Sequence, residues 1–162
     1  MKSPAACALA FALFTTGGCG SDDDGVVPIE EPDASVAQPD AAPLSASCME
    51  AMDKSDILWI QDNIFNSCAA FSVCHQGAAN SAGGLNLESG FAEAAMVNVD
   101  SVLFPDYKLV VPGDPDNSYL MTILGAVDGP LKDGVGTMPY NNPTLCEPKL
   151  EAISRWISAL PQ

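Results

Sequence analysis

The sequence predicts an all-α domain of short helices joined by long loops, and three observations lead to this prediction. Apolar residues recur at helical spacing in residues 54–68 and again in residues 146–160. No segment alternates strictly between apolar and polar residues over more than a few positions, so the chain shows no clear strand. Between the helical patterns, long stretches rich in Gly, Ser and Asn predict loops.

Residues 1–18 are typical of a secretory signal peptide of the lipoprotein type. One lysine precedes an apolar run at 5–14, which small residues follow. The run is too short to span a bilayer, which takes about 20 apolar residues. The segment TGGC at 16–19 resembles the lipobox of bacterial lipoproteins, which implies lipidation of Cys19, and Gly20 after it favours the outer membrane. The alternative is ordinary cleavage, which would leave Cys19 free or in a disulfide.

Residues 19–47 are predicted to comprise the lipidated Cys19 and, after it, a disordered acidic tether. Residues 20–47 carry seven acidic residues and four prolines, and no basic or aromatic residue. Such a composition buries too little apolar surface to offset the entropy of ordering, and its like charges repel one another. We expect this segment to hold a lipid-anchored domain clear of the membrane, on the periplasmic side of the outer membrane or at the cell surface.

Residues 48–162 form the predicted folded domain, whose composition argues against several functions. It has 14 acidic and five basic residues, a net charge of minus nine. Nucleic acid is disfavoured as a partner because phosphate contacts need clustered Lys and Arg. Anionic lipid is disfavoured for the same reason, so we expect membrane contact through the lipid anchor only. With no nucleophile motif, no phosphate loop and one histidine, we expect no enzyme activity.

The first two helices are predicted at residues 54–68 and 90–99. In the first, the apolar side chains fall on one stripe, and Ser55 or Asp56 can cap the N-terminus. The residues between the two helices, 76–90, are rich in Gly, Ala, Ser and Asn and predict a loop.

Two further helices are predicted in the second half of the domain. Asp114 can cap one of them, with Pro115 at its first position and Gly125 beyond its end. Residues 127–144 predict a second long loop, and residues 146–160 predict an amphipathic helix that a proline terminates. Loops of this length in a compact domain indicate either a function or a missing constraint.

The domain contains four cysteines, namely Cys48, Cys68, Cys74 and Cys146. An even number in an exported domain indicates disulfides, haem thioethers or one of each, and the sequence does not choose among the possible pairings. A bond between Cys48 and Cys146 would clamp the two ends of the domain and could contribute roughly 4 kcal/mol to stability. Cys68 and Cys74 would then pair with each other or attach a haem.

The stretch FNSCAAFSVCHQG at 65–77 ends its cysteine pair with a Cys-His dipeptide, which holds the only histidine of the chain. The stretches LNLESG, VVPGDPDNSYL, TMPY and ISRWISAL follow it in this order. Together they make the domain resemble a class I cytochrome c, most of all the cytochrome c-like domains of bacterial lipoproteins, over nearly all of 57–160. The spacing departs from the family, whose motif has two residues between the cysteines, or three or four in variants. Here five residues separate them.

The resemblance implies a cytochrome c-like bundle that holds one covalent haem c. Cys68 and Cys74 would form the thioether bonds, His75 would be the proximal iron ligand and Met138 the distal one. Ligation by histidine and methionine raises the reduction potential and suits electron transfer. The expected function is therefore a periplasmic, lipid-anchored electron carrier that serves a redox partner protein.

A second hypothesis keeps the cytochrome c fold but has no haem. The disulfides Cys48–Cys146 and Cys68–Cys74 would replace the cofactor, and the domain would serve a binding or structural role. The histidine would then be inherited from a haem-binding ancestor, and the loop methionine would fill a gap in the packing. The state of Cys68 and Cys74 distinguishes the two hypotheses.

Overall fold

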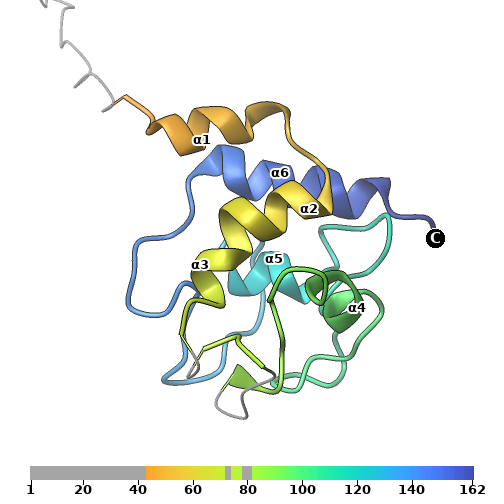
Figure 1. The fold of residues 1–162 in the computed structure, drawn as a ribbon. Coiled ribbons are helices and arrows are strands. Elements are labelled where there is room, and N and C mark those ends of the chain that lie inside the picture. The colour runs from red at the N-terminus through yellow and green to blue at the C-terminus, as the bar shows by residue number, and fades with distance from the viewer. Residues whose placement is uncertain (1–42, 72–73, 78–81) are drawn as a thin grey trace, which may run out of the picture. The chain divides into compact units, whose positions relative to one another are not determined.

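The computed structural model describes residues 43–71, 74–77 and 82–162 of the chain (Figure 1). In these residues the regular structure is helical, and the only β-structure consists of isolated bridges. The prediction of an all-α domain with short helices is therefore confirmed. The predicted signal peptide, the predicted lipidation site Cys19 and most of the predicted tether lie outside the described residues.

Two short helices precede the first predicted helix. They are α1, Ala46–Glu50, and the 3-10 helix η1, Ala51–Asp53. The Ser45 hydroxyl caps α1 by accepting a hydrogen bond from the Cys48 N–H at 3.3 Å. Sequence reasoning missed both helices because so few residues show no apolar period. Within the described residues, regular structure starts at Ala46, just before the predicted domain boundary at residue 48.

The helix predicted at 54–68 forms, but its middle is a π-helix. The three consecutive parts are α2, Ile57–Ile60, the π-helix η2, Gln61–Phe65, and α3, Asn66–Cys68. A π-turn closes its hydrogen bonds over one residue more than an α-turn, and such turns are frequent at functional sites. This one lies directly before α3, whose last residue, Cys68, begins the stretch 68–77, called the Cys-His segment below.

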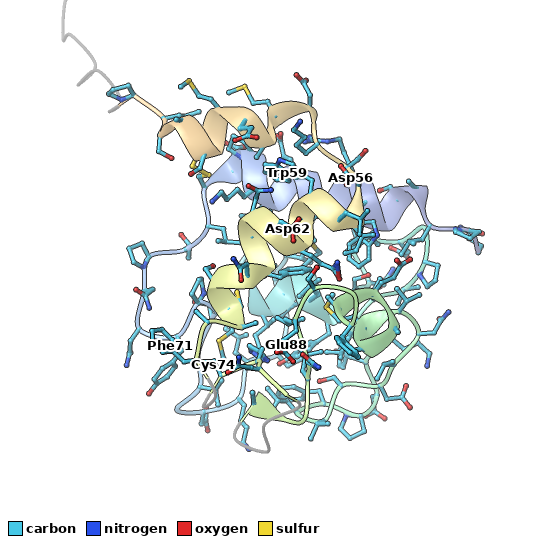
Figure 2. All side chains as sticks on the ribbon, viewed as in Figure 1. Asp56, Trp59, Asp62, Phe71, Cys74 and Glu88 are labelled. Atoms are coloured by element: carbon cyan, nitrogen blue, oxygen red, sulfur yellow. A yellow bond between two sulfur atoms is a disulfide. The ribbon has the colours of Figure 1, made fainter. Side chains whose placement is uncertain are left out.

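Asp56 caps this helix, as Figure 2 shows at its N-terminal end, and its Oδ1 accepts a hydrogen bond from the Trp59 N–H at 2.8 Å. Asp56→Ala should lower the free energy of unfolding by about 1 kcal/mol, because the helix loses this acceptor. Urea unfolding measures the change. The control is Asp62→Ala, which removes an exposed carboxylate farther along the same helix. Equal losses in the two variants would contradict a specific role of the cap.

Helices α4, Ala92–Met96, and α6, Glu147–Ala159, lie at their predicted places. With 13 residues, α6 is the longest helix in the described part of the chain. Nowhere in that part does a helix combine the length and the apolar character of a membrane span.

Helix α5 spans Tyr119–Ile123, so its predicted start next to Asp114 is wrong. The Asp114 carboxylate instead accepts hydrogen bonds from the Asn117 N–H at 3.2 Å and from the Asn117 side-chain amide at 2.7 Å. The Ser118 hydroxyl donates to the Asp114 carbonyl at 2.7 Å. These local bonds offer the backbone an alternative to the helix and delay its start to Tyr119.

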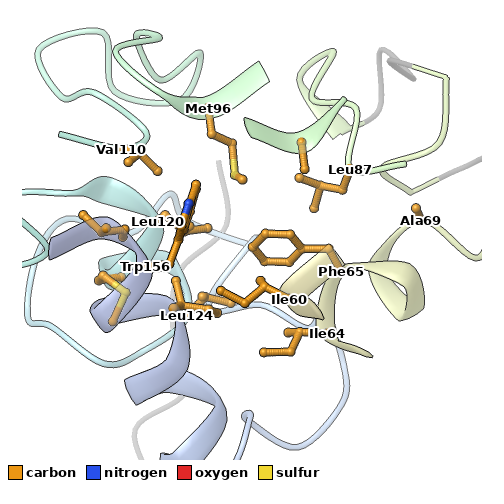
Figure 3. Close-up of a cluster of buried hydrophobic side chains, with 14 residues drawn as sticks. Ile60, Ile64, Phe65, Ala69, Leu87, Met96, Val110, Leu120, Leu124 and Trp156 are labelled. Atoms are coloured by element: carbon orange, nitrogen blue, oxygen red, sulfur yellow. The ribbon is translucent and has the colours of Figure 1, made fainter. Parts of the chain in front are cut away.

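The core gathers apolar side chains from all the longer helical segments (Figure 3). In Figure 3 the rings of Phe65 and Trp156 lie at its centre, with Met96 and Leu87 on one side of them. Side chains that expose at most 1 % of their surface include Ile60, Ile64, Ala92, Met96, Val110, Ile153 and Ile157. Full burial of each large aliphatic side chain contributes about 1.5–3 kcal/mol. Leu87 belongs to residues 85–90, which follow the Cys-His segment in the chain, so this core also holds residues 85–90 in place.

Two connections join α6 to the N-terminal helices. Cys48 and Cys146 form a disulfide with their Cα atoms 6.2 Å apart, which is the pairing that the sequence suggested. The Arg155 guanidinium donates hydrogen bonds to the carbonyls of Lys54, at 3.0 Å, and Ala51, at 2.9 Å. The N-terminal end and the second half of α6 are therefore fixed to the start of the domain.

Candidate functional site

The segment from Cys68 to His75 closes on itself through backbone hydrogen bonds. The His75 N–H donates to the Cys68 carbonyl at 3.2 Å, and the Cys74 N–H donates to the Phe71 carbonyl at 2.9 Å. Residues 72–73, between these contacts, lie outside the described part of the chain. The closure brings the histidine next to the first cysteine, although five residues separate the two cysteines.

Cys68 and Cys74 are free thiols, and both are half-buried. The disulfide between them that the haem-free hypothesis required is therefore not formed in this structure. Burial raises the pKa of the Cys68 thiol, a hydrogen bond with Ser67 opposes this change, and the neighbouring Cys74 adds to the rise. Cys68 is thus a neutral thiol at neutral pH.

One backbone carbonyl orients the half-buried ring of His75. Its Nδ1 lies 3.3 Å from the carbonyl oxygen of Leu85. Because a carbonyl only accepts hydrogen bonds, Nδ1 carries the proton and the free lone pair of the neutral ring is on Nε2. Burial lowers the pKa of His75, while the bond to Leu85 partly opposes that shift. A neutral ring whose Nδ1–H is bonded to a carbonyl is the form in which histidine binds metals through Nε2.

Residues 85–90 make two more contacts with the Cys-His segment. The Leu87 N–H donates to the His75 carbonyl at 2.9 Å. The Gly77 N–H donates to the Glu88 carboxylate, with 3.1 Å between the nitrogen and Oε2. The stretch LNLESG at 85–90 contributes to the resemblance, but its role beside His75 was not predictable, because most of its contacts use backbone groups that every residue carries.

Met138 lies in the long loop between α5 and α6. Its N–H donates to the Ile123 carbonyl at 2.7 Å, which fastens the loop to the end of α5. The half-buried side chain packs against the core, as do the side chains of Cys68 and Leu85. The loop of Met138 and the segment of His75 therefore border one apolar cluster. Among the described residues, no hydrogen bond joins Met138 to His75.

Tyr119 is a second buried polar feature, apart from the Cys-His segment. Its hydroxyl has no hydrogen-bond partner among the described residues, which costs about 1–3 kcal/mol. The ring packs on Phe104 and Tyr107, with centroid distances of 5.6 Å and 5.9 Å. It is not part of the apolar cluster that borders Cys68 and Met138, so it does not mark this site.

The donors of the site match one kind of metal group. In the described ranges, no cluster of three or more His, Cys, Asp or Glu side chains could hold a bare metal ion. The candidate donors are an imidazole nitrogen of His75, a thioether sulfur of Met138 and the two free thiols of Cys68 and Cys74. One imidazole and one thioether are the axial ligands of iron in cytochromes c, and free thiols are what covalent attachment of haem requires. The residues therefore fit a haem chemically.

Comparison of the chain with models of protein families, with curated proteins and with solved structures gives no match. The likeness to cytochromes c is therefore an inference from the sequence motifs.

Proposed function

We propose that residues 48–162 form a c-type cytochrome-like electron carrier with one covalent haem. Lipidation of Cys19 would anchor it on the periplasmic side of the outer membrane or at the cell surface. The observation that carries the proposal is the hydrogen bond from the His75 N–H to the Cys68 carbonyl, at 3.2 Å. It supports haem attachment because it keeps the histidine beside a free cysteine in spite of the enlarged spacing.

Four side chains would hold the haem. Cys68 and Cys74 would hold the haem covalently through thioether bonds to its vinyl groups. His75, through Nε2, and Met138, through its sulfur, would hold the iron. When bound, haem iron takes up and gives off single electrons, and this ligand pair favours a high reduction potential.

The protein's own contribution is orientation and charge. The Leu85 carbonyl fixes the ring of His75, and the apolar cluster packs against the side chains of Cys68 and Met138. The domain carries 14 acidic and five basic residues, which suits a redox partner protein with a basic surface in the periplasm.

An absorption spectrum and an intact mass test the proposal. The full chain is produced in bacteria that have a haem-attachment machinery, and its mass is measured after denaturation. We expect sharp bands in the reduced form and a mass increase that survives denaturation. A colourless protein lighter by two hydrogens for each cysteine pair would refute the proposal in favour of a haem-free, disulfide-stapled module.

Met138→Ala should change the absorption spectrum of the haem-loaded protein and lower its reduction potential. The mass increase from the attached haem should stay. The iron would lose one of its two protein ligands, but the thioether bonds would still hold the haem. Absorption spectra and a redox titration measure this. The control is Met52→Ala, which removes an exposed methionine from η1. If the two variants have the same spectrum, Met138 is not a ligand.

A further inference from the structure

Residues 85–90, called the strap below, lie along the Cys-His segment and contact it three times. Two of these contacts use backbone groups of the strap, the Leu85 carbonyl and the Leu87 N–H, and both go to His75. The third uses the carboxylate of Glu88, which accepts from the Gly77 N–H at 3.1 Å. Of the three, only the Glu88 contact uses a side chain of the strap, so only this one can be removed by a substitution within the strap.

The far end of the strap is fixed to the π-helix η2. The Gly90 N–H donates to Oε1 of Gln61 at 3.2 Å, and Gln61 exposes only 3 % of its surface. Within the strap, Oδ1 of Asn86 accepts from the Glu88 N–H at 2.9 Å, which orients that residue. Leu87, 4 % exposed, is part of the core. The strap is therefore a fixed support, and Glu88 transmits its position to the loop beyond the histidine.

We propose that Glu88 is a positioning residue for His75. Its carboxylate holds Gly77 against the strap, so the backbone on the C-terminal side of His75 cannot turn away from Leu85. The direction of the Nε2 lone pair then depends on Glu88, although Glu88 does not touch the ring. This inference rests on the proposed function for its purpose, but its geometry does not require a bound haem. Figure 2 shows Glu88 and Cys74 at the same end of the domain, away from α1.

Three variants of the full chain test the inference. Glu88→Ala removes both the acceptor and the charge, whereas Glu88→Gln removes the charge and keeps an acceptor oxygen. The control Glu93→Ala removes an exposed acid from α4. The readouts are the nitrogen NMR signals of the His75 ring and the hydrogen exchange rate of the Gly77 amide. If the protein carries haem, it is studied in the reduced state.

We expect Glu88→Ala to speed exchange of the Gly77 amide about tenfold or more, the effect of losing a hydrogen bond to a charged acceptor. Gly77 is exposed, so this bond is its main protection. The His75 ring signals should shift in Glu88→Ala and stay close to wild type in Glu88→Gln. In haem-loaded protein both variants lose the same charge, so a difference between their reduction potentials reports positioning alone.

The inference would be overturned if Glu88→Ala changed the His75 ring signals and the Gly77 exchange rate no more than the control Glu93→Ala does. Should Glu88→Ala fail to fold, Glu88→Asp takes its place, because it keeps the charge but is shorter by one methylene, and the Gly77 amide should again exchange faster. The two proposals fail differently. A colourless protein whose His75 signals respond to Glu88→Ala refutes the electron carrier and keeps the positioning role, whereas a haem-loaded protein that does not respond refutes the positioning role alone.

Discussion

Replacing Cys68 and Cys74 together with serine should abolish covalent haem attachment completely. A serine hydroxyl does not form the thioether bond that a cysteine thiol forms. His75 and Met138 would still be present, but coordination bonds do not survive denaturation of the chain. Intact mass after denaturation measures the result: the variant should have the mass of the polypeptide alone, whereas the unmodified protein should be heavier.

The matched control replaces the other cysteine pair of the domain. Cys48→Ser with Cys146→Ser removes the same number of sulfur atoms and should keep the mass increase. If both double variants lost the increase, loss of the native fold rather than of an attachment site would explain the result. If Cys68→Ser with Cys74→Ser kept it, these residues would not be the attachment site.

The Cys48–Cys146 disulfide should make a large contribution to the stability of the domain, because it constrains the unfolded chain. Cys48→Ser with Cys146→Ser should lower the free energy of unfolding by roughly 4 kcal/mol, because the lost bond closes a loop with a sequence separation of 98. The hydrogen bonds of Arg155 would remain between the same helices. Guanidinium unfolding, followed by circular dichroism, measures the loss.

A reductant supplies the internal control for this prediction. Unfolding of the unmodified domain in the presence of reductant should reproduce most of the loss, and the Cys48→Ser, Cys146→Ser variant should not respond to it. If the Cys48→Ser, Cys146→Ser variant lost stability only after reduction, a different disulfide bond would be responsible for the loss. An unchanged free energy of unfolding would show that the closed loop does not constrain the unfolded chain.

The sequence predicted the helices whose apolar stripes are long enough to show a period. Helix α6, Glu147–Ala159, is the clearest case, because its pattern runs over several turns and a proline follows it. The start of α5 was wrong since Asp114 bonds to Asn117 and forms a turn of its own. The π-helix η2 could not be predicted, because its apolar positions are also compatible with an α-helix.

The candidate site was predictable only as far as its residue types are unusual. Two cysteines and the only histidine within one short stretch attract attention by themselves, and the structure brings Cys68 and His75 together. The supports of the histidine were not predictable. The Leu85 carbonyl and the Leu87 N–H are ordinary backbone groups, and Glu88 resembles any other surface acid until its contact with Gly77 is known.

The Cys48–Cys146 bond also determines how the domain responds to a mechanical pull. A force that separates residue 43 from the C-terminus passes from α1 through the two sulfur atoms into α6, and it bypasses the chain between them. The bypassed loop has a sequence separation of 98, so roughly 330 Å of extended chain cannot be drawn out while the bond persists. The Cys-His segment lies inside this loop. Tension on the proposed lipid anchor at Cys19 would therefore leave that segment unloaded, and reduction of one bond would expose it to the full force.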